Sequence, residues 1–403
     1  MSMELEQARQ HFLHGVQAFE AGRLEQARQS FEAALALAPE RASVLLNLGA
    51  THFRLQNWHE ALPLLQRAAA ADATQADVWT YLGLTHEALG QWQAAVAPLA
   101  RALELAPRHA GLWLAYGRCH ARVGSVEPAL QAFERAVALA PGAAEAWSAR
   151  GGLLRELNRL QEAAACFEKA LSLGADPDLH GYYLAAVRGA QPPAAPPRRY
   201  VEGLFDEYAS DFQEHLVGQL RYQAHERLLQ PLVRAARRYP TVLDLGCGSG
   251  LCGPLVRPLA DAIDGVDVSA GMLGQARRLG VYRDLFHADL ASFLAETMLR
   301  PDLVLAADVF IYVGELSSVF RTVRRILAPS GCFAFTVETS PDGQEVRLLP
   351  SLRYAHSESY VRRLAQAHGF TVRELFAAPL RYDQGQPVQG LYAFLERTPG
   401  PNS

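Results

Sequence analysis

Lysine is almost missing from this chain of 403 residues, in which Lys169 is the single lysine against 37 arginines. This imbalance is typical of a GC-rich bacterial coding sequence and does not by itself indicate phosphate binding. An excess of positive charge is missing too, since 42 acidic residues face 38 basic ones. A broad electrostatic surface for nucleic acid or anionic lipid requires such an excess. We therefore expect neither nucleic acid nor membrane as a partner.

Cysteine is also scarce, and the cysteines lack the paired CxxC spacing of zinc sites. The five are Cys119, Cys166, Cys247, Cys252 and Cys332. Because they are scattered and odd in number, we expect buried thiols in a reducing cytoplasm and no metal site. The amino end has no basic segment followed by an apolar core, and no run reaches about 18 apolar residues. The sequence therefore predicts a cytoplasmic protein without a membrane span.

The first half of the chain repeats with a period of 34 residues, marked by Gly15, Gly49, Gly83, Gly117 and Gly151. Two sets of alanines and one set of large apolar residues follow in the same register. They are Ala27, Ala61, Ala95, Ala129 and Ala163; Ala34, Ala68, Ala102, Ala136 and Ala170; and Phe31, Leu65, Leu99, Phe133 and Phe167. Small residues at fixed positions let two helices approach closely, and each helical hairpin needs its neighbours to cover its apolar side. The pattern predicts an all-α superhelix.

This pattern closely resembles the tetratricopeptide repeat, in about five copies spanning residues 8–177. Tryptophan precedes three of the glycines by four residues, at Trp79, Trp113 and Trp147. Residues 178–190 look like a closing helix, so we expect a repeat domain over residues 1–190. The resemblance implies a protein or peptide partner on the concave face of the superhelix.

Four arginines are expected on that concave face, namely Arg54, Arg118, Arg122 and Arg155. Such a cluster can hold an acidic or carboxyl-terminal peptide through forked hydrogen bonds. It can equally be a solvated, arginine-rich surface, and the sequence leaves both interpretations open.

A proline-rich stretch, "AQPPAAPPRRY", covers residues 190–200 and has no period. Such a composition predicts an extended and fairly stiff linker, which we place at residues 191–200. A short linker keeps any partner captured by the repeats close to the second domain.

Apolar strands and helical stretches alternate from Thr241 onward, which predicts an α/β fold with a doubly wound parallel sheet. The expected strands cover residues 241–246, 262–268, 283–289, 302–308 and 332–338. Two more, at 370–378 and 388–396, have no helix between them and should pair antiparallel. We thus expect a Rossmann-like sheet of seven strands with an antiparallel last strand, in a domain over residues 201–397.

A glycine-rich turn, "VLDLGCGSG", ends the first of these strands and carries Gly246, Gly248 and Gly250. Its backbone can bend sharply and present amide hydrogens to a ligand. Gly248, Gly250 and Gly253 also satisfy the dinucleotide pattern GxGxxG, so the turn alone leaves the ligand open.

Three aspartates favour a methyl donor over a dinucleotide. Asp244 precedes the glycines, where a carboxylate repels a pyrophosphate but suits the ammonium group of a methionine moiety. Asp267 ends the second strand and can accept both ribose hydroxyls, a role that NAD enzymes share. Asp289 follows the third strand, where it can accept from the adenine amino group, cap a helix, or do both.

Residues 200–397 resemble a class I S-adenosylmethionine-dependent methyltransferase. The whole chain resembles bacterial predicted methyltransferases with tetratricopeptide repeats, including the segments "LFDEYASDFQEHL", "AADVFIYVG" and "RYAHSESYV". The resemblance implies S-adenosylmethionine as cofactor. The residues implied to bind it are Asp244, Gly246, Cys247, Gly248, Gly250, Asp267, Met272, Asp289 and Leu290.

The methyl acceptor is expected beyond the fourth and fifth strands, where Asp308 and Glu338 are candidate catalytic residues. Asp308 can bind the donor or orient the acceptor, or it can be a strand-end residue that accepts backbone hydrogen bonds. His356 is our first candidate for a general base, because a neutral imidazole takes a proton near neutral pH. It can also simply precede a helix capped by Ser357. A lid from the segment before the first strand would carry Tyr208, Phe212 and His215, and Tyr208, Phe212 and Tyr312 can shield a sulfonium by cation–π contact.

The acceptor itself is not revealed by these motifs. No NPPY-like run or Pro-Cys pair of nucleic-acid methylases follows the fourth strand. Our first hypothesis is an enzyme whose repeats recruit a protein or carrier-bound substrate. The alternatives are a small-molecule carboxyl or hydroxyl methyltransferase with regulatory repeats, and a scaffold whose methyltransferase fold senses the donor without turnover.

Overall fold

The computed structural model of the chain describes residues 3–208, 222–340, 342–383 and 385–398. The chain divides into two compact units, residues 1–175 and residues 176–403, which are described separately. Among the described residues, no helix is long and apolar enough to cross a membrane. In the same parts of the chain, no group of three His, Cys, Asp or Glu residues is placed to hold a metal ion.

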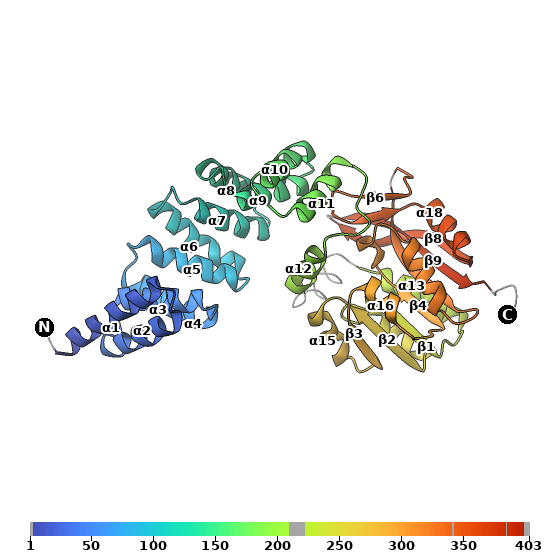
Figure 1. Cartoon of the computed structure of the whole chain (residues 1–403), viewed down its shortest axis with the longest axis horizontal. Helices are drawn as coiled ribbons and strands as arrows, with labels where there is room; N and C mark the ends of the chain where they lie inside the picture. Colours follow the sequence, from blue (N-terminus) through green and yellow to red (C-terminus); the bar gives the residue numbers. More distant parts are fainter. Residues whose placement is uncertain (1–2, 209–221, 341, 384, 399–403) are drawn as a thin grey trace. The chain divides into compact units, whose positions relative to one another are not determined.

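The first unit consists of helical hairpins that stack side by side in chain order (Figure 1). Its helices are α1 (Met3–Glu20), α2 (Leu24–Leu37), α3 (Ala42–Arg54), α4 (Trp58–Ala71), α5 (Ala76–Ala88), α6 (Trp92–Leu105), α7 (Ala110–Arg122), α8 (Val126–Leu139), α9 (Ala144–Glu156) and α10 (Leu160–Ser172). Each predicted repeat corresponds to one pair, from α1–α2 to α9–α10. The predicted repeat architecture is confirmed.

The repeating glycines explain how the two helices of a hairpin come so close. A Cβ atom on any of the five would lie 2.5–2.7 Å from the Phe or Leu side chain that follows 16 residues later, as from Gly15 to Phe31. No side chain fits at such a distance, so the first helix must carry glycine where the second presents its large apolar residue. Both predicted sets of alanines are fully buried, which fits the same close packing.

The tryptophans join neighbouring repeats through hydrogen bonds. The indole Nε1 atoms of Trp79, Trp113 and Trp147 donate to the carbonyls of Ala73, Pro107 and Pro141 at 2.9, 2.9 and 3.0 Å, respectively. Each carbonyl belongs to the turn that ends the preceding repeat. These bonds satisfy polar groups that the turn would otherwise leave to solvent.

All four arginines predicted for partner binding have partners within the first unit. Arg118 forms ion pairs with Glu87 and Glu145, both at 2.7 Å. Arg54 lies over the Phe19 ring, and Arg122 lies over the Trp92 ring. Arg155 forms an ion pair with Glu156. A peptide carboxylate would therefore have to compete with these contacts.

The second unit begins before the expected boundary at residue 190, because α11 (Pro177–Arg188) packs within it. Tyr182 of α11 is 1% exposed and clusters with Leu348, Leu352 and Tyr354. Its hydroxyl donates to the Leu352 carbonyl at 2.7 Å. The predicted closing helix therefore exists, but it belongs to the second unit.

The proline-rich segment is likewise held in place. We call residues 190–197 the strap; α12 (Arg198–Tyr208) follows it. The Ala194 carbonyl accepts hydrogen bonds from the amides of Gly314 and Glu315 at 2.9 and 3.2 Å. The Tyr354 hydroxyl donates to the Pro193 carbonyl at 2.9 Å. The segment predicted as a linker is thus attached to the second unit.

A mostly parallel sheet forms the centre of the second unit (Figure 1). Its strands are β1 (Thr241–Leu245), β2 (Ala262–Asp267), β3 (Asp284–His287), β4 (Leu303–Ala306), β5 (Cys332–Thr339), β6 (Val346–Leu348), β7 (Tyr354–His356), β8 (Phe370–Asp383) and β9 (Gln386–Arg397). The path runs β3-β2-β1-β4-β5-β7-β6, and β9 pairs antiparallel with both β5 and β8. All seven expected strands and the antiparallel hairpin are confirmed.

Two short strands were not expected from the sequence. β7 pairs in parallel with the end of β5, through Glu338 and Thr339, and β6 pairs antiparallel with β7. These strands have three residues each, too few to show an apolar alternation. They matter because they carry the chain from the end of β5 to His356.

Helices cover both faces of the sheet, and two apolar cores result. On one face lie α16 (Leu290–Glu296), α17 (Ser317–Ile326) and α18 (Glu358–Ala367). On the other lie α13 (Ala224–Ala235), the short α14 (Cys252–Val256) and a 3-10 turn, η2 (Arg257–Leu259). Strands buried on both faces are expected to be almost continuously apolar, which explains sequences such as that of β4. Helix α15 (Ala270–Arg278) follows β2, and a second 3-10 turn, η3 (Phe310–Tyr312), follows β4.

Candidate functional site

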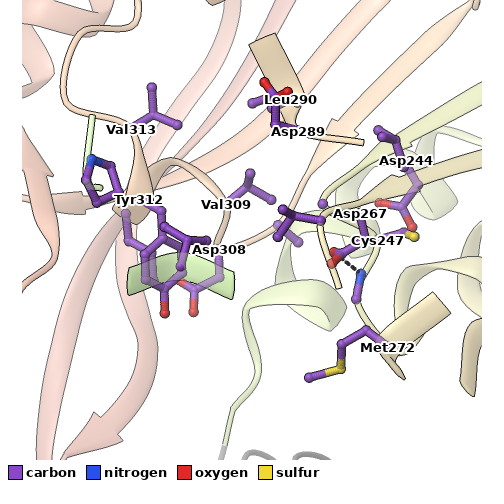
Figure 2. A pocket seen from close by; sticks show the side chains of 18 of the residues that line it. Asp244, Cys247, Asp267, Met272, Asp289, Leu290, Asp308, Val309, Tyr312 and Val313 are labelled. Atoms are coloured by element: carbon purple, nitrogen blue, oxygen red, sulfur yellow. Dashed lines mark hydrogen bonds between the residues drawn. The ribbon is translucent and has the colours of Figure 1, made fainter. Parts of the chain in front are cut away.

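A cavity of about 610 Å³ lies at the carboxyl ends of the central strands. Its walls come from the segments that follow β1, β2, β3 and β4, together with the strap and α12. The sheet order reverses at β1, which is flanked by β2 and β4, and ligands of open α/β sheets bind at such a reversal. Figure 2 shows Asp244, Cys247, Asp267 and Met272 at one end of the cavity and Asp308, Tyr312 and Val313 at the other. We call these the glycine-loop end and the Tyr312 end.

The glycine loop needs its glycines for two different reasons. Gly246 and Gly248 have φ angles of +62° and +53°, which favour glycine. A Cβ atom on Gly246 would lie 2.7 Å from Val309, whereas one on Gly248 would meet nothing within 4 Å. Gly248 therefore borders open space at the cavity wall. Gly250 does not line the cavity; a Cβ there would lie 2.8 Å from Leu279 at the end of α15.

Asp267 links the end of β2 to the glycine loop. Its two carboxylate oxygens accept hydrogen bonds from the amides of Gly248 and Ser269 at 2.8 and 2.9 Å. Burial raises the pKa of Asp267, and these backbone hydrogen bonds partly oppose the rise. Each carboxylate oxygen can accept more than one hydrogen bond, so Asp267 can still accept from two hydroxyls of a ligand.

Asp244 lies deeper, 1% exposed at the end of β1. Burial raises its pKa to about 7, although the Tyr282 hydroxyl donates to it at 2.7 Å. A buried carboxylate with one neutral donor lacks a counter-charge, and a cationic ligand group would supply one. This arrangement suits the ammonium or sulfonium group of a methyl donor.

The adenine-binding residues implied by the resemblance also line the cavity. Met272, fully buried in α15, is held by the Ser269 hydroxyl, which accepts from the Met272 amide at 3.3 Å. Asp289 caps α16 by accepting from the Ser292 amide at 2.9 Å, and Leu290 begins that helix. Partial burial opposes ionisation of Asp289, but the hydrogen bonds from Ser292 outweigh it and lower the pKa. The capping interpretation of Asp289 is confirmed, and its place on the cavity wall is compatible with both roles.

The Tyr312 end is dominated by a buried ion cluster that the sequence did not reveal. Arg381 of β8, 2% exposed, pairs with Asp308 at 3.2 Å and with Glu338 at 2.7 Å. Asp308 and Arg381 line the cavity, while Glu338 lies behind Arg381 and does not. Burial raises the pKa of Glu338, and the charge of Arg381 opposes that rise. Asp308 adopts φ +60°, a left-handed conformation that a non-glycine residue rarely adopts without functional or structural cause.

His356 does not occupy the position expected of a general base. Its side chain is fully buried, is not part of the cavity wall, and stacks on the Tyr360 ring. Nε2 donates to the Gly314 carbonyl at 2.9 Å, and burial lowers the pKa to about 4. The alternative interpretation fits the geometry, because Ser357 caps α18 and His356 precedes it. His356 thus holds the loop after η3 instead of facing a substrate.

Several cavity residues had no signal in the sequence. Arg353 and Arg381 come from a turn and from the final hairpin, and only tertiary packing brings them here. His225 of α13 lines the cavity, stacks on Tyr222 with ring centroids 5.2 Å apart, and has its pKa lowered by burial. The strap contributes Ala194, Ala195 and Pro196. Of the lid candidates, Tyr208 ends α12, and Phe212 and His215 lie outside the described residues.

Cavity and lining suit S-adenosylmethionine in size and charge. The volume falls within the roughly 300–1,000 Å³ of small-molecule sites. Open space beside Gly248 admits a ligand against the backbone, and Asp244, Asp267 and Asp289 give the wall the negative charge that a cationic donor requires.

Comparison with known proteins identifies both units. The family described as a methyltransferase domain matches residues 214–375. Tetratricopeptide repeat families match residues 40–108, 81–143 and 122–180. A crystal structure of MamA is 25% identical with a TM-score of 0.38, covering 40% of this chain and 93% of that one.

Curated methyltransferases match part of the chain. Malonyl-(acyl-carrier protein) O-methyltransferase of Legionella pneumophila is 33% identical over 39% of this chain and 57% of its own length. Trans-aconitate 2-methyltransferase of Methylobacterium nodulans is 34% identical over 42% and 62%. Malonyl-(acyl-carrier protein) O-methyltransferase of Geobacter sulfurreducens is 32% identical over 46% and 69%. The chain thus spans less than two thirds of the first two relatives and slightly more of the third.

The family matches agree with the glycine loop of the second unit and with the tetratricopeptide hairpins described above. S-adenosylmethionine is the methyl donor of the methyltransferase family concerned. The chain therefore belongs to the class I S-adenosylmethionine-dependent methyltransferases, with tetratricopeptide repeats preceding its methyltransferase domain.

Proposed function

We propose that this protein methylates an acceptor group carried by a protein partner and that the repeats recruit this partner. The size of the cavity is the observation on which the proposal rests. A volume of about 610 Å³ accommodates a donor and a small acceptor group, but not a folded domain. An acceptor attached to a protein must therefore enter on a side chain or a flexible arm. Tetratricopeptide repeats in the same chain raise the local concentration of such a partner.

The glycine-loop end binds the donor in this proposal. Asp267 accepts from the ribose hydroxyls while its bonds to the Gly248 and Ser269 amides hold its carboxylate in position. Asp244 faces the positive charge of the methionine portion, Met272 contacts the adenine, and Asp289 accepts from the adenine amine. The bound donor supplies an electrophilic methyl group on a sulfonium. The chain's own contribution is to align the acceptor with that methyl and to exclude water.

The named acceptors of the relatives support a carrier-bound acid. Seven of the curated relatives are malonyl-(acyl-carrier protein) O-methyltransferases or trans-aconitate 2-methyltransferases. Both named acceptors contain carboxylates, and one is attached to a carrier protein. The second name favours the alternative in which a free small acid is methylated and the repeats regulate the enzyme.

A labelling experiment separates the two proposals. Full-length protein is incubated with methyl-labelled S-adenosylmethionine and size-fractionated extract of its own cells, and label is expected in a macromolecular fraction. A tenfold or greater preference for a malonyl-carrier protein over a malonyl thioester of a small thiol would support recruitment. Label confined to small molecules would favour the alternative, and no label despite donor binding would refute both.

Asp267→Ala is the matched test of the donor site. The ribose contacts of a charged carboxylate contribute about 1.5–3 kcal/mol, so calorimetry should show donor affinity weakened by roughly 10- to 150-fold. Asp284→Ala removes an exposed carboxylate from the neighbouring β3 and should leave affinity unchanged. Equal affinities for both variants would contradict the assignment of the donor site.

A further inference from the structure

Among the residues that the structure describes, three arginines line the cavity, and their pairing differs. Arg381 is neutralised within the protein by Asp308 and Glu338. Arg198 lies in the field of Asp289 at the glycine-loop end, where it lowers the pKa of that carboxyl. Arg353 forms no ion pair with any carboxylate among the described residues, although it is half-buried in the cavity wall. Arg353 lies in the field of Glu338, but that carboxyl is already paired with Arg381, so Arg353 has no ion pair of its own among the described residues.

The backbone around Arg353 is fixed, so its position is not that of a loose surface residue. The Leu349 amide donates to the Arg353 carbonyl at 2.9 Å, and the Leu352 amide donates to the Leu349 carbonyl at 2.8 Å. Tyr182 of α11 donates its hydroxyl to the carbonyl of Leu352, which has φ +63°. β7 begins one residue after Arg353. Hydrogen bonds before Arg353 and strand β7 after it therefore fix the backbone from which the side chain extends to the cavity wall.

Tyr312 is the polar neighbour of Arg353 at this end. Burial raises the pKa of the Tyr312 hydroxyl, and the charge of Arg353 and a hydrogen bond from it oppose the rise. Tyr312 also lines the cavity, beside Val313 (Figure 2). A guanidinium and a phenol hydroxyl together present several donors and one positive charge. They form a natural binding site for a planar anion.

A partly buried guanidinium that has no ion pair of its own is costly, and a ligand carboxylate lowers that cost through paired, charge-assisted hydrogen bonds. A carboxylate acceptor is also already ionised at neutral pH, because its pKa is about 4. It needs no general base, which agrees with the position of His356 outside the cavity wall.

We infer that the Tyr312 end of the cavity is a carboxylate-binding subsite, in which Arg353 and Tyr312 hold an acidic acceptor beside the methyl donor. This inference rests on the proposed function and adds the residues that would hold an acidic acceptor. A diacid or triacid can place one carboxylate on Arg353 and direct another toward the donor. In the transfer step, a carboxylate oxygen forms a bond to the methyl carbon as the carbon–sulfur bond breaks, leaving a methyl ester and a neutral thioether.

The test measures acid binding to the full-length protein without turnover. Protein saturated with S-adenosylhomocysteine is titrated with malonate and with trans-aconitate by ligand-observed NMR. At least one acid should bind, and the neutral diester dimethyl malonate should bind about tenfold more weakly or less. Arg353→Gln should weaken acid binding by about tenfold or more, as expected for the loss of a charge-assisted pair. Tyr312→Phe should cause a smaller loss.

Arg362→Gln is the matched control, since Arg362 is an exposed residue of α18 and pairs with Glu358. It should bind the acids as the unaltered protein does. Equal acid binding by Arg353→Gln and Arg362→Gln, equal binding of diester and diacid, or no binding of either acid at millimolar concentration would overturn the inference. Calorimetry of S-adenosylhomocysteine on the same samples separates failure of the proposed function from failure of the subsite. If the unaltered protein does not bind S-adenosylhomocysteine, the proposed function itself is contradicted. If it binds S-adenosylhomocysteine but neither acid, only the subsite is contradicted.

Discussion

The strap provides the sharpest test of how the cavity wall is built. Gly314, which follows η3, is in direct contact with the strap. A Cβ atom on Gly314 would lie 2.9 Å from the carbonyl oxygens of both Pro193 and Ala194, and 2.6 Å from the Tyr354 ring. Two of these three atoms belong to the backbone and cannot rotate away. Gly314→Ala should therefore displace the strap from the loop that carries Tyr312.

The size of the effect follows from the bonds that would be lost. The amides of Gly314 and Glu315 and the Tyr354 hydroxyl all donate to strap carbonyls. Each such hydrogen bond contributes about 0.5–1.5 kcal/mol, so the local loss should be about 2–4 kcal/mol. Hydrogen exchange of the Glu315 amide measures the same free energy locally. Exchange should be roughly 30- to 1,000-fold faster in Gly314→Ala.

A second glycine gives the matched control. Gly181 lies within α11, and a Cβ atom there would meet nothing within 4 Å. Gly181→Ala should leave exchange at Glu315 unchanged and stabilise α11 by up to about 1 kcal/mol, because alanine favours helix. Similar, slow exchange at Glu315 in both variants would refute the conclusion that the strap is fastened to this loop.

Two pH-dependent predictions follow from buried groups. The pKa of Asp244 is raised to about 7 by burial, and a cationic donor favours the ionised form, so donor affinity should rise with pH up to about 7 and then level off. Asp244→Asn should abolish that dependence in calorimetry between about pH 5.5 and 7; an unchanged slope would contradict the proposed contact. The pKa of His356 is lowered from 6.5 to about 4, so the folded state binds this proton less readily than the unfolded state does. Stability from this group is complete above pH 6.5 and falls toward pH 4 by about 3 kcal/mol. Denaturant titrations at successive pH values should show a shallower acid loss in His356→Gln, and parallel curves would refute the burial argument.

Both folds follow largely from local sequence signals. The repeats are readable because each glycine and its large partner, such as Gly83 and Leu99, recur in the same register, and their contact is within one hairpin. The parallel strands are readable because burial on both faces makes them continuous apolar runs. The glycine loop and Asp267 are readable because they stand at strand ends, where an α/β sheet binds its ligand.

The domain boundary and the Tyr312 end depend on contacts between distant parts of the chain. Tyr182 bonds to Leu352 across 170 residues, and nothing near Tyr182 in sequence distinguishes a repeat cap from a helix of the second unit. Arg381 meets Asp308 across 73 residues. The prolines predict an extended segment without regular structure, whose carbonyls are left available, and the Ala194 carbonyl accepts from the amides of the Gly314 loop.

His356 is predicted from the sequence to act as a general base, but in the structure it positions the loop that follows η3. The Gly314 amide donates to the carbonyl of Ala194 in the strap, and His356 Nε2 donates to the Gly314 carbonyl. Gly314 is therefore held by hydrogen bonds on both its amide and its carbonyl. Two residues before Gly314 stands Tyr312, which lines the cavity and interacts with Arg353. Substitution of His356 is therefore expected to move Tyr312, and reduced turnover after such a substitution is not by itself a sign of proton transfer. A base would contribute its own ionisation to the pH–rate profile, whereas a positioning residue with a pKa of about 4 leaves the profile near neutral pH unchanged.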